Sequence, residues 1–182
     1  LEMKAEIKPF KSIYMARIAQ LSNKSNQFNL TTRRYTLGEI ESIADDNNYI
    51  TLYGKLTDKF GDNGVVTVVI GHIITGEIVA IDVIPDNGLV CDIDLWIMSC
   101  RVLKRDMEYA MLDTLVAAAR KKGIEYLVGH YYPTAKNKMV KEFYNDMGFD
   151  KVSEDEEGDS LWLLNITGDY KKQNRYIKVE EY

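Results

Sequence analysis

The chain has 182 residues, a formal net charge of −5, an apolar fraction of 46% and a charged fraction of 28%. These values are typical of one globular domain, and the mild negative charge disfavours a general nucleic-acid binder, which normally has a basic face. No apolar run approaches the ~20 residues that a membrane-spanning helix needs. With two cysteines and no signal-like segment, we expect a cytoplasmic protein without a membrane or nucleic-acid partner.

The first half of the chain predicts two helices followed by strands. Apolar residues recur every three or four positions over 9–22, which favours a helix. Thr36 and Glu39 have the spacing of a capping box, and this spacing predicts a short helix over 37–46. Alternating apolar residues and turn sequences then predict antiparallel hairpins, with strands over 49–61, 65–74 and 77–84.

The second half predicts two longer helices between strands. One helix covers 105–122, where Gly123 is a suitable stop, and the other runs from Pro133 to Gly148. The predicted strands are 89–103, 125–132, 149–155 and 160–167. This order predicts an α/β or α+β fold with a mostly antiparallel mixed sheet flanked by helices.

The strand-to-helix junction DLWIMSCRVLKRDMEYAMLDTL, residues 94–115, contains the first candidate for chemistry. Unpaired N–H groups at a helix start can hold phosphate groups. Cys100 precedes the helix beside Arg101, Lys104 and Arg105, and positive charge next to a thiol favours the reactive thiolate. Cys100 is therefore a candidate nucleophile, and a small buried apolar residue is the alternative.

Other residues in the chain are candidates for binding or proton transfer. Asp94 lies in an apolar strand, so its carboxylate needs a partner such as Arg101 or contacts substrate hydroxyls. His130 is a candidate base or a structural residue. Arg33 and Arg34 could hold a phosphate through forked hydrogen bonds or could pair with surface carboxylates. The histidine and cysteine spacings predict no metal site. The candidate substrate contacts are Asp94, Trp96, Arg33 and Arg34.

The element order, the central junction and the segment NKMVKEFYNDMGF resemble the GNAT acyltransferase fold. The segment matches the family pattern N-x5-F-Y-x3-G-F at Asn137, Phe143, Tyr144, Gly148 and Phe149. The resemblance implies that Asn137 contacts the cofactor and that Tyr144 protonates the departing thiolate. Periodicity alone also fits Tyr144 as an aromatic residue that faces the core.

A closer resemblance extends from about Ile18 to Phe149. The segments RIAQLSNKSNQFNLTTRRYT, DKFGDNG, IDLWIMSCRVL and YPTAKNKMVKEFYNDMGF are similar to the C-terminal half of FkbH-like proteins. Those proteins join a phosphatase-like domain of the haloacid-dehalogenase (HAD) type to a GNAT-like domain, and load a glyceryl unit onto an acyl carrier protein. The resemblance implies a connector helix and linker from an N-terminal HAD-like domain over 1–30, a GNAT-like domain over 31–168 and a charged tail over 169–182.

The junction departs from the pattern of both families, which place glycines there. A bare glycine backbone lets phosphate oxygens approach closely, whereas this chain has Lys104, Asp106 and Glu108. Two carboxylates disfavour high-affinity coenzyme A binding. The resemblance implies that the cofactor is phosphopantetheine on a carrier protein, or coenzyme A, and that this domain holds no metal. The cofactor contacts that it implies are Asn137, Arg101, Val102, Lys104, Arg105, Asp106, Met107 and Glu108.

Three functions remain open at this point. The first is transfer of an acyl group, expected to be glyceryl, from Cys100 to the pantetheine thiol of a carrier protein, in a cleft where strand 89–103 diverges from strand 125–132. It requires that Cys100 and Tyr144 face one groove. The second is a non-catalytic GNAT-shaped module that docks the carrier protein or the HAD-like domain, which the lost glycines favour. The third is a coenzyme A-dependent N-acetyltransferase, which the junction carboxylates disfavour.

Overall fold

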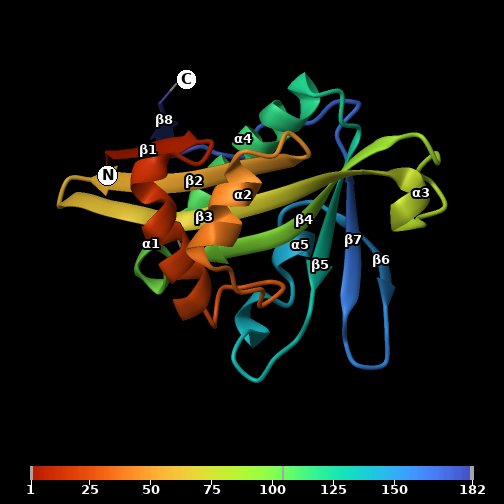
Figure 1. Cartoon of the computed structure of the whole chain (residues 1–182), viewed down its shortest axis with the longest axis horizontal. Coiled ribbons are helices and arrows are strands. Elements are labelled where there is room, and N and C mark those ends of the chain that lie inside the picture. Colours follow the sequence, from red (N-terminus) through yellow and green to blue (C-terminus); the bar gives the residue numbers. More distant parts are fainter. Residues whose placement is uncertain (1, 104, 181–182) are drawn as a thin grey trace.

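Eight strands form one sheet in the order β6-β7-β5-β4-β3-β2-β1-β8 in the computed structural model, which describes residues 2–103 and 105–180 (Figure 1). Among the described residues only the pairs β4–β5 and β1–β8 are parallel, so the predicted mostly antiparallel α/β architecture is confirmed. The strands are β1 Met3–Lys8, β2 Tyr49–Asp58, β3 Gly61–Thr75, β4 Leu89–Met98, β5 Tyr126–Tyr131, β6 Asp150–Glu154, β7 Ser160–Asn165 and β8 Ile177–Val179.

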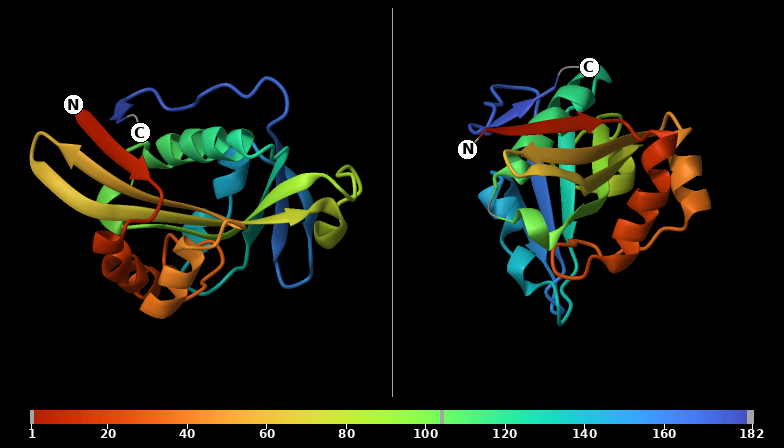
Figure 2. Two further views of the ribbon diagram at one scale, coloured as in Figure 1. Left: turned by 45° about the horizontal axis from the view of Figure 1, so that its top comes forward. Right: turned by 90° about the vertical axis from the view of Figure 1, so that its left-hand side faces the viewer.

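Helices cover both faces of the sheet (Figure 2). One face carries α1 (Ser12–Lys24) and α2 (Leu37–Ala44), and the other carries α4 (Met107–Lys121) and α5 (Phe143–Asp146). Thr36 and Glu39 form both hydrogen bonds of the predicted capping box at the start of α2. The apolar stripe of α4 packs on the sheet as predicted, and the helix ends before Gly123, whose φ is +75°. No helix among the described residues has the length and apolarity to cross a bilayer.

Three predicted elements differ from the structure. The strand predicted over 89–103 ends at Met98, and the 3-10 turn η1 (Cys100–Val102) follows it. The strand predicted over 77–84 is replaced by the short helix α3 (Gly76–Val79) and turns, because Ile81 and Ile84 bury their side chains at a spacing of three residues rather than alternating. The helix predicted from Pro133 to Gly148 contains only a 3-10 turn, η2 (Lys138–Val140), and α5.

A β-bulge in β4 changes the side-chain pattern of this strand. The β3–β4 register shifts between Ile70 and Gly71, and Asp94 is the extra residue on β4. After the bulge, Trp96 packs in the core on the α4 face, whereas Asp94 is half-buried on the α1 and α2 face. The bulge therefore places Asp94 and Trp96 on opposite faces of the sheet, whereas an unbroken alternation over 89–103 would place them on the same face.

The N-terminal residues belong to the same sheet and core as the rest of the chain. β1 pairs with β2 in antiparallel register, and Ile18 of α1 is fully buried. The described residues of the predicted connector, 2–30, thus supply one strand of the sheet and one covering helix.

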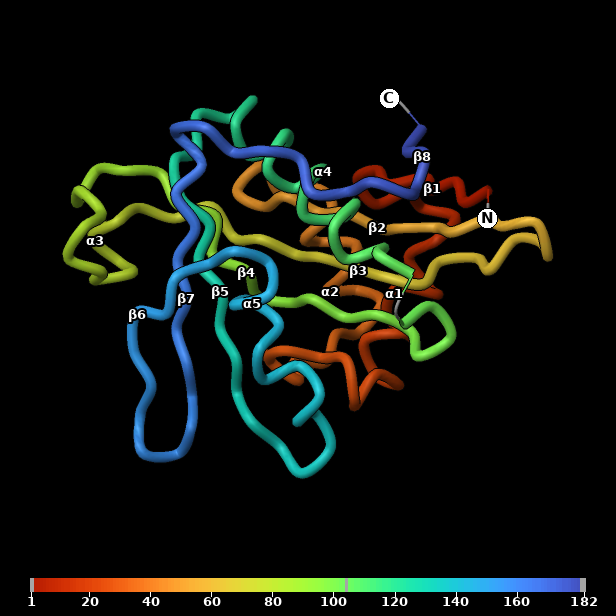
Figure 3. The backbone as a smooth tube through the Cα atoms, turned by 180° about the vertical axis from the view of Figure 1, so that it is seen from behind, coloured from red at the N-terminus to blue at the C-terminus, as the bar shows by residue number. Residues whose placement is uncertain are grey.

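The described part of the tail, residues 169–180, forms a strap that crosses α4 and ends in β8 beside β1 (Figure 3). Asp113 of α4 anchors this C-terminal strap, because its carboxylate accepts hydrogen bonds from the hydroxyl of Tyr170 and the backbone N–H groups of Gln173 and Asn174. The charged tail predicted over 169–182 is thus packed on the domain along its described part.

Candidate functional site

β4 and β5 separate after a short parallel contact. They pair only from Val90 to Asp92 on β4, and beyond this point the two strands point apart (Figure 1). The backbone groups on the facing edges of the strands then need other partners. The chain itself supplies them through residues 28–31, which we call the plug segment.

The plug segment is bonded to both diverging strands. Its carbonyl and amide groups pair in an antiparallel bridge with the outer half of β4, and they also bond the residue that follows β5. The predicted pantetheine cleft between the strands is therefore filled by the protein's own backbone. The bonds run from Met98 N to Phe28 O (3.2 Å), Leu30 N to Trp96 O (3.4 Å), Thr31 Oγ1 to Asp94 O (2.6 Å) and Tyr132 N to Leu30 O (2.9 Å).

A group of ionisable side chains lies on the α1 and α2 face, where the strands begin to separate. We call Arg33, Asp92, Asp94 and His130 the polar centre. His130 Nε2 lies 2.5 Å from Asp92 Oδ1, and the two side chains are 24% and 22% exposed. The strand register causes this contact, because Asp92 pairs with Val128, and His130 projects from the same face of β5 two residues later.

The contact between His130 and Asp92 gives the imidazole a defined role. A carboxylate accepts hydrogen bonds, so the neutral imidazole donates from Nε2 to Asp92. Nδ1 then keeps its lone pair, and it has no hydrogen bond to any described residue. A partly exposed imidazole that is oriented by a carboxylate can take a proton from a bound acceptor group. The sequence identified His130 as a candidate base but did not identify Asp92.

Asp94 and Arg33 complete the polar centre. Burial raises the pKa of the Asp94 carboxyl group, and the nearby charge of Arg33 opposes that shift. The Asp94 carboxyl group forms no ion pair within the described part of the chain. Its expected partner Arg101 bonds instead to Ser99 Oγ and to the carbonyl of Asn63. Within the described residues no cluster of histidine, cysteine and carboxylate side chains could hold a metal ion.

The structure does not bring Cys100 and Tyr144 together. The Cys100 thiol is exposed just past the end of β4, 3.2 Å from Gln27 Oε1. The Tyr144 side chain is only 1% exposed, its ring packs on Gly129, and its hydroxyl has no hydrogen-bond partner. Burial, and then the charge of Asp92 on β4, raise the pKa of Tyr144 well above its usual value. The core-facing alternative for Tyr144 agrees with this burial.

Asn137 has no free capacity for a cofactor. Its side chain is fully buried. An asparagine amide can accept two hydrogen bonds and donate two, and all four are made within the chain. Asn137 therefore ties the plug segment to the loop after β5. The bonds are Thr134 N to Oδ1 (2.7 Å), Tyr131 Oη to Oδ1 (3.3 Å), Nδ2 to Asn29 O (3.0 Å) and Nδ2 to Tyr132 O (2.9 Å).

Other predicted contacts are also occupied by structural roles. Trp96 is fully buried, although its Nε1 lacks a partner. Arg34 donates to the carbonyls of Ser22 and Ser25, at 2.6 Å each, so it caps the end of α1. The sequence could not separate this role from phosphate binding, because both use an arginine beside polar residues.

Three predicted cofactor contacts at the junction belong to the core or to an ion pair. Val102, in the 3-10 turn η1 (Cys100–Val102), and Met107 are fully buried. Arg105 is ion-paired with Asp58 at the end of β2. Lys104 lies outside the described residues.

The start of α4 does not fit a pyrophosphate group. Asp106 precedes the helix in the left-handed conformation, with φ of +65°, and its side chain does not cap the helix. Glu108 follows in the first turn, where burial and the charge of Asp106 raise its pKa. A phosphate at the free N–H groups of this helix would meet both carboxylates. The residues present therefore disagree with the coenzyme A site that the resemblance implies.

Comparisons with known proteins identify the fold. Arabidopsis thaliana NAA60 in complex with acetyl-CoA matches with a TM-score of 0.69 and 15% identity, over 91% of this chain and 100% of that chain. The GNAT domain of S. lividans PAT matches with a TM-score of 0.62 and 16% identity, over 87% of this chain and 89% of that chain. The ribosomal-protein-S18-alanine N-acetyltransferase from Escherichia coli matches with a TM-score of 0.60 and 12% identity, over 94% of this chain and 99% of that chain. The predicted GNAT-like fold is thereby confirmed. No protein-family model and no curated protein matches the chain.

Proposed function

We propose that this chain is an acyltransferase domain in which His130, oriented by Asp92, is the general base. The observation that carries the proposal is the 2.5 Å contact between these side chains, at the point where two strands of a GNAT fold separate. The acceptor gives its proton to His130 Nδ1 while its nucleophilic atom bonds to the carbonyl carbon of an acyl thioester. The carbon–sulfur bond then breaks, and the departing thiolate receives the proton.

The acyl group in this proposal is glyceryl, and the acceptor is the pantetheine thiol of an acyl carrier protein. Support comes from the segments that resemble FkbH-like proteins, and from Asp94, whose half-buried carboxyl group can accept hydrogen bonds from the glyceryl hydroxyls. An N-terminal HAD-like domain is the other proposed partner. Cys100 is a proposed acyl-carrying thiol, because its sulfur is exposed. Since Cys100 and His130 occupy different places, they would act in separate steps.

Variants of the polar centre test the general base. With a synthetic glyceryl thioester as donor and a holo carrier protein as acceptor, we expect His130→Asn to lower the transfer rate by about 10²–10⁴-fold. Asp92→Asn should lower the transfer rate less, because the imidazole of His130 remains present although the carboxylate that orients it is lost. Thermal unfolding of both variants serves as the control for folding. A His130→Asn protein that is folded and transfers at the wild-type rate contradicts the proposal.

Intact-mass analysis tests Cys100 separately. Incubation with the glyceryl thioester should add one glyceryl group to the wild-type chain and none to Cys100→Ala. An adduct that survives the substitution excludes Cys100 as the carrier.

A coenzyme A-dependent N-acetyltransferase is the second candidate, because the fold is shared with the acetyl-CoA complex of NAA60. The carboxylates of Asp106 and Glu108 oppose it. Calorimetry with acetyl-CoA and an acetylation assay distinguish this candidate from glyceryl transfer. Micromolar binding of acetyl-CoA together with acetylation of a peptide amine supports the N-acetyltransferase. Carrier-protein binding with no transfer of either acyl group would instead support a docking module, which the filled cleft favours.

A further inference from the structure

A second polar site lies away from the polar centre, at the wide end of the gap between β4 and β5. A cavity of about 810 Å³ opens there between the end of α1, the turn η1 and the loop after β5. This volume is within the range of small-molecule sites. We call this cavity the basic pocket, because the charged residues that line it are Arg17, Lys24, Arg101 and Lys136.

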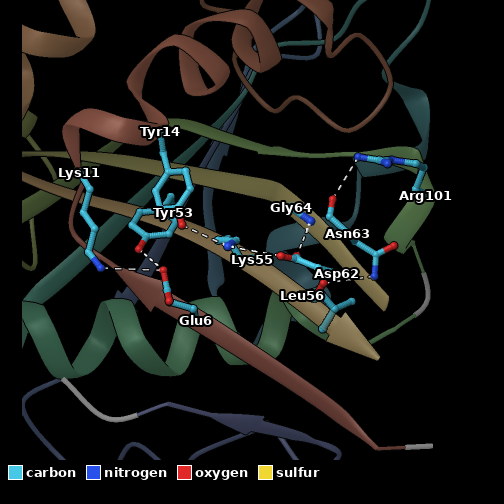
Figure 4. A network of polar contacts seen from close by, with 10 residues as sticks. All are labelled: Glu6, Lys11, Tyr14, Tyr53, Lys55, Leu56, Asp62, Asn63, Gly64 and Arg101. Atoms are coloured by element: carbon cyan, nitrogen blue, oxygen red, sulfur yellow. Dashed lines mark hydrogen bonds and ion pairs between the residues drawn. The ribbon is translucent and has the colours of Figure 1, made fainter. Parts of the chain in front are cut away.

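The charge of the basic pocket is not balanced by the protein. No carboxylate lines the cavity, and none of its four cationic side chains forms an ion pair within the described part of the chain. Arg17 donates to Gln20 Oε1 at 3.0 Å, and Arg101 donates to the carbonyl of Asn63 at 3.3 Å (Figure 4). Burial, followed by the charge of Arg101, lowers the pKa of Arg17. Both guanidinium groups therefore have only neutral hydrogen-bond partners among the described residues.

Structural roles do not account for this set of cations. Lys24 lies in the last turn of α1, where a positive charge stabilises the helix dipole, but this explains one residue of the four. Arg34 differs from these four residues, because its guanidinium group donates hydrogen bonds to the carbonyls of Ser22 and Ser25. Arg17 and Arg101 keep donor groups that no described residue uses, and both residues line the cavity.

We propose that the basic pocket binds the phosphate group of a small phosphorylated ligand. Guanidinium groups form paired, charge-assisted hydrogen bonds with phosphate oxygens, and lysine ammonium groups add charge at the rim. The phosphate could belong to a phosphopantetheine arm or to a phosphorylated three-carbon acid. The cationic side chains on the α1 side would thus bind an anion, whereas the carboxylates at the start of α4 repel an anion. The proposal does not depend on the polar centre or on acyl transfer.

Calorimetry with matched ligands tests the binding. Pantetheine 4′-phosphate, 3-phosphoglycerate and inorganic phosphate are the probes, and pantetheine without phosphate is the control ligand. We expect at least one phosphorylated probe to bind, and the tighter of the two organic probes identifies the source of the phosphate. Arg17→Gln and Arg101→Gln should each weaken that binding about tenfold or more. Lys178→Gln, which removes one positive charge from the exposed side of β8, should change it less than twofold.

The Cys100 thiol provides a second readout, because it lines the basic pocket whereas Cys91 is fully buried. Bound phosphate ligand should slow alkylation of Cys100 by iodoacetamide at least fivefold, and Arg101→Gln should remove this protection. The proposal is overturned if no phosphorylated probe binds, if pantetheine binds equally well, or if neither arginine variant weakens binding.

Discussion

The unpartnered hydroxyl of Tyr144 makes Tyr144→Phe an informative substitution. A buried hydroxyl without a hydrogen bond costs about 1–3 kcal/mol of folding free energy. Its removal leaves a void of about 10–15 Å³, which costs roughly 0.3 kcal/mol. We therefore expect Tyr144→Phe to raise the free energy of unfolding by about 1 kcal/mol, and to raise Tm by about 2–4 °C for a chain of this length.

Tyr131→Phe is the matched control. Tyr131 is also buried, at 3% exposure, but its hydroxyl donates to Asn137 Oδ1. Its loss should lower the free energy of unfolding by about 1 kcal/mol. Urea unfolding of both variants at pH 7 measures these two changes in the free energy of unfolding, which should have opposite signs. A destabilised Tyr144→Phe would refute the burial argument, and a fall of about 10²-fold in its acyl-transfer rate would instead support a proton-donor role.

Two further substitutions test the packing and the charge near the site. Gly129→Ala should destabilise the fold by about 1–3 kcal/mol, because a Cβ atom there would lie 2.6 Å from the ring of Tyr144. The double variant with Tyr144→Leu should recover part of this loss when both proteins are unfolded in urea. Strictly additive losses of the two single variants would contradict the contact. Asp94→Asn tests a raised carboxyl pKa. Such a group destabilises the folded state when it ionises, so the wild type should lose stability relative to Asp94→Asn as the pH rises from about 4 towards 7. Unfolding curves for both proteins across this range give the unfolding free energy of the wild type minus that of Asp94→Asn, and a difference that stays constant or rises with pH would contradict the sign.

Local signals in the sequence predicted those elements that depend on neighbouring residues. The capping box of α2 and the apolar stripe of α4 need no information from distant parts of the chain. β1 and β8 were missed because each is short and depends on partners far away in sequence. The expected helix after Pro133 is interrupted because Asn137 bonds the backbone of Thr134 and Tyr132, and such side-chain bonds compete with helical ones.

The site was predictable in part for the same reason. His130 and Asp94 stand out as polar residues within apolar strands, and Arg33 stands out as one of two adjacent arginines. Asp92 gains its role only from the β4–β5 register, which no local pattern reveals. The expected groove shared by Cys100 and Tyr144 required an unbroken β4 and an open gap between strands, whereas the structure has a bulge at Asp94 and the plug segment in the gap.

The pairing of β8 with β1 also affects the order in which the sheet can be completed. β1 is synthesised before every other described strand of the sheet, yet its outer edge is covered by residues 177–179, which are synthesised after all of them. This strand edge is therefore unpaired during most of the synthesis of the domain, and such edges recruit strands from other molecules. Once residues 169–180 are free to fold, Asp113 binds the strap and β8 covers the edge. A chain truncated before residue 169 would thus keep the β1 edge unpaired and be prone to self-association.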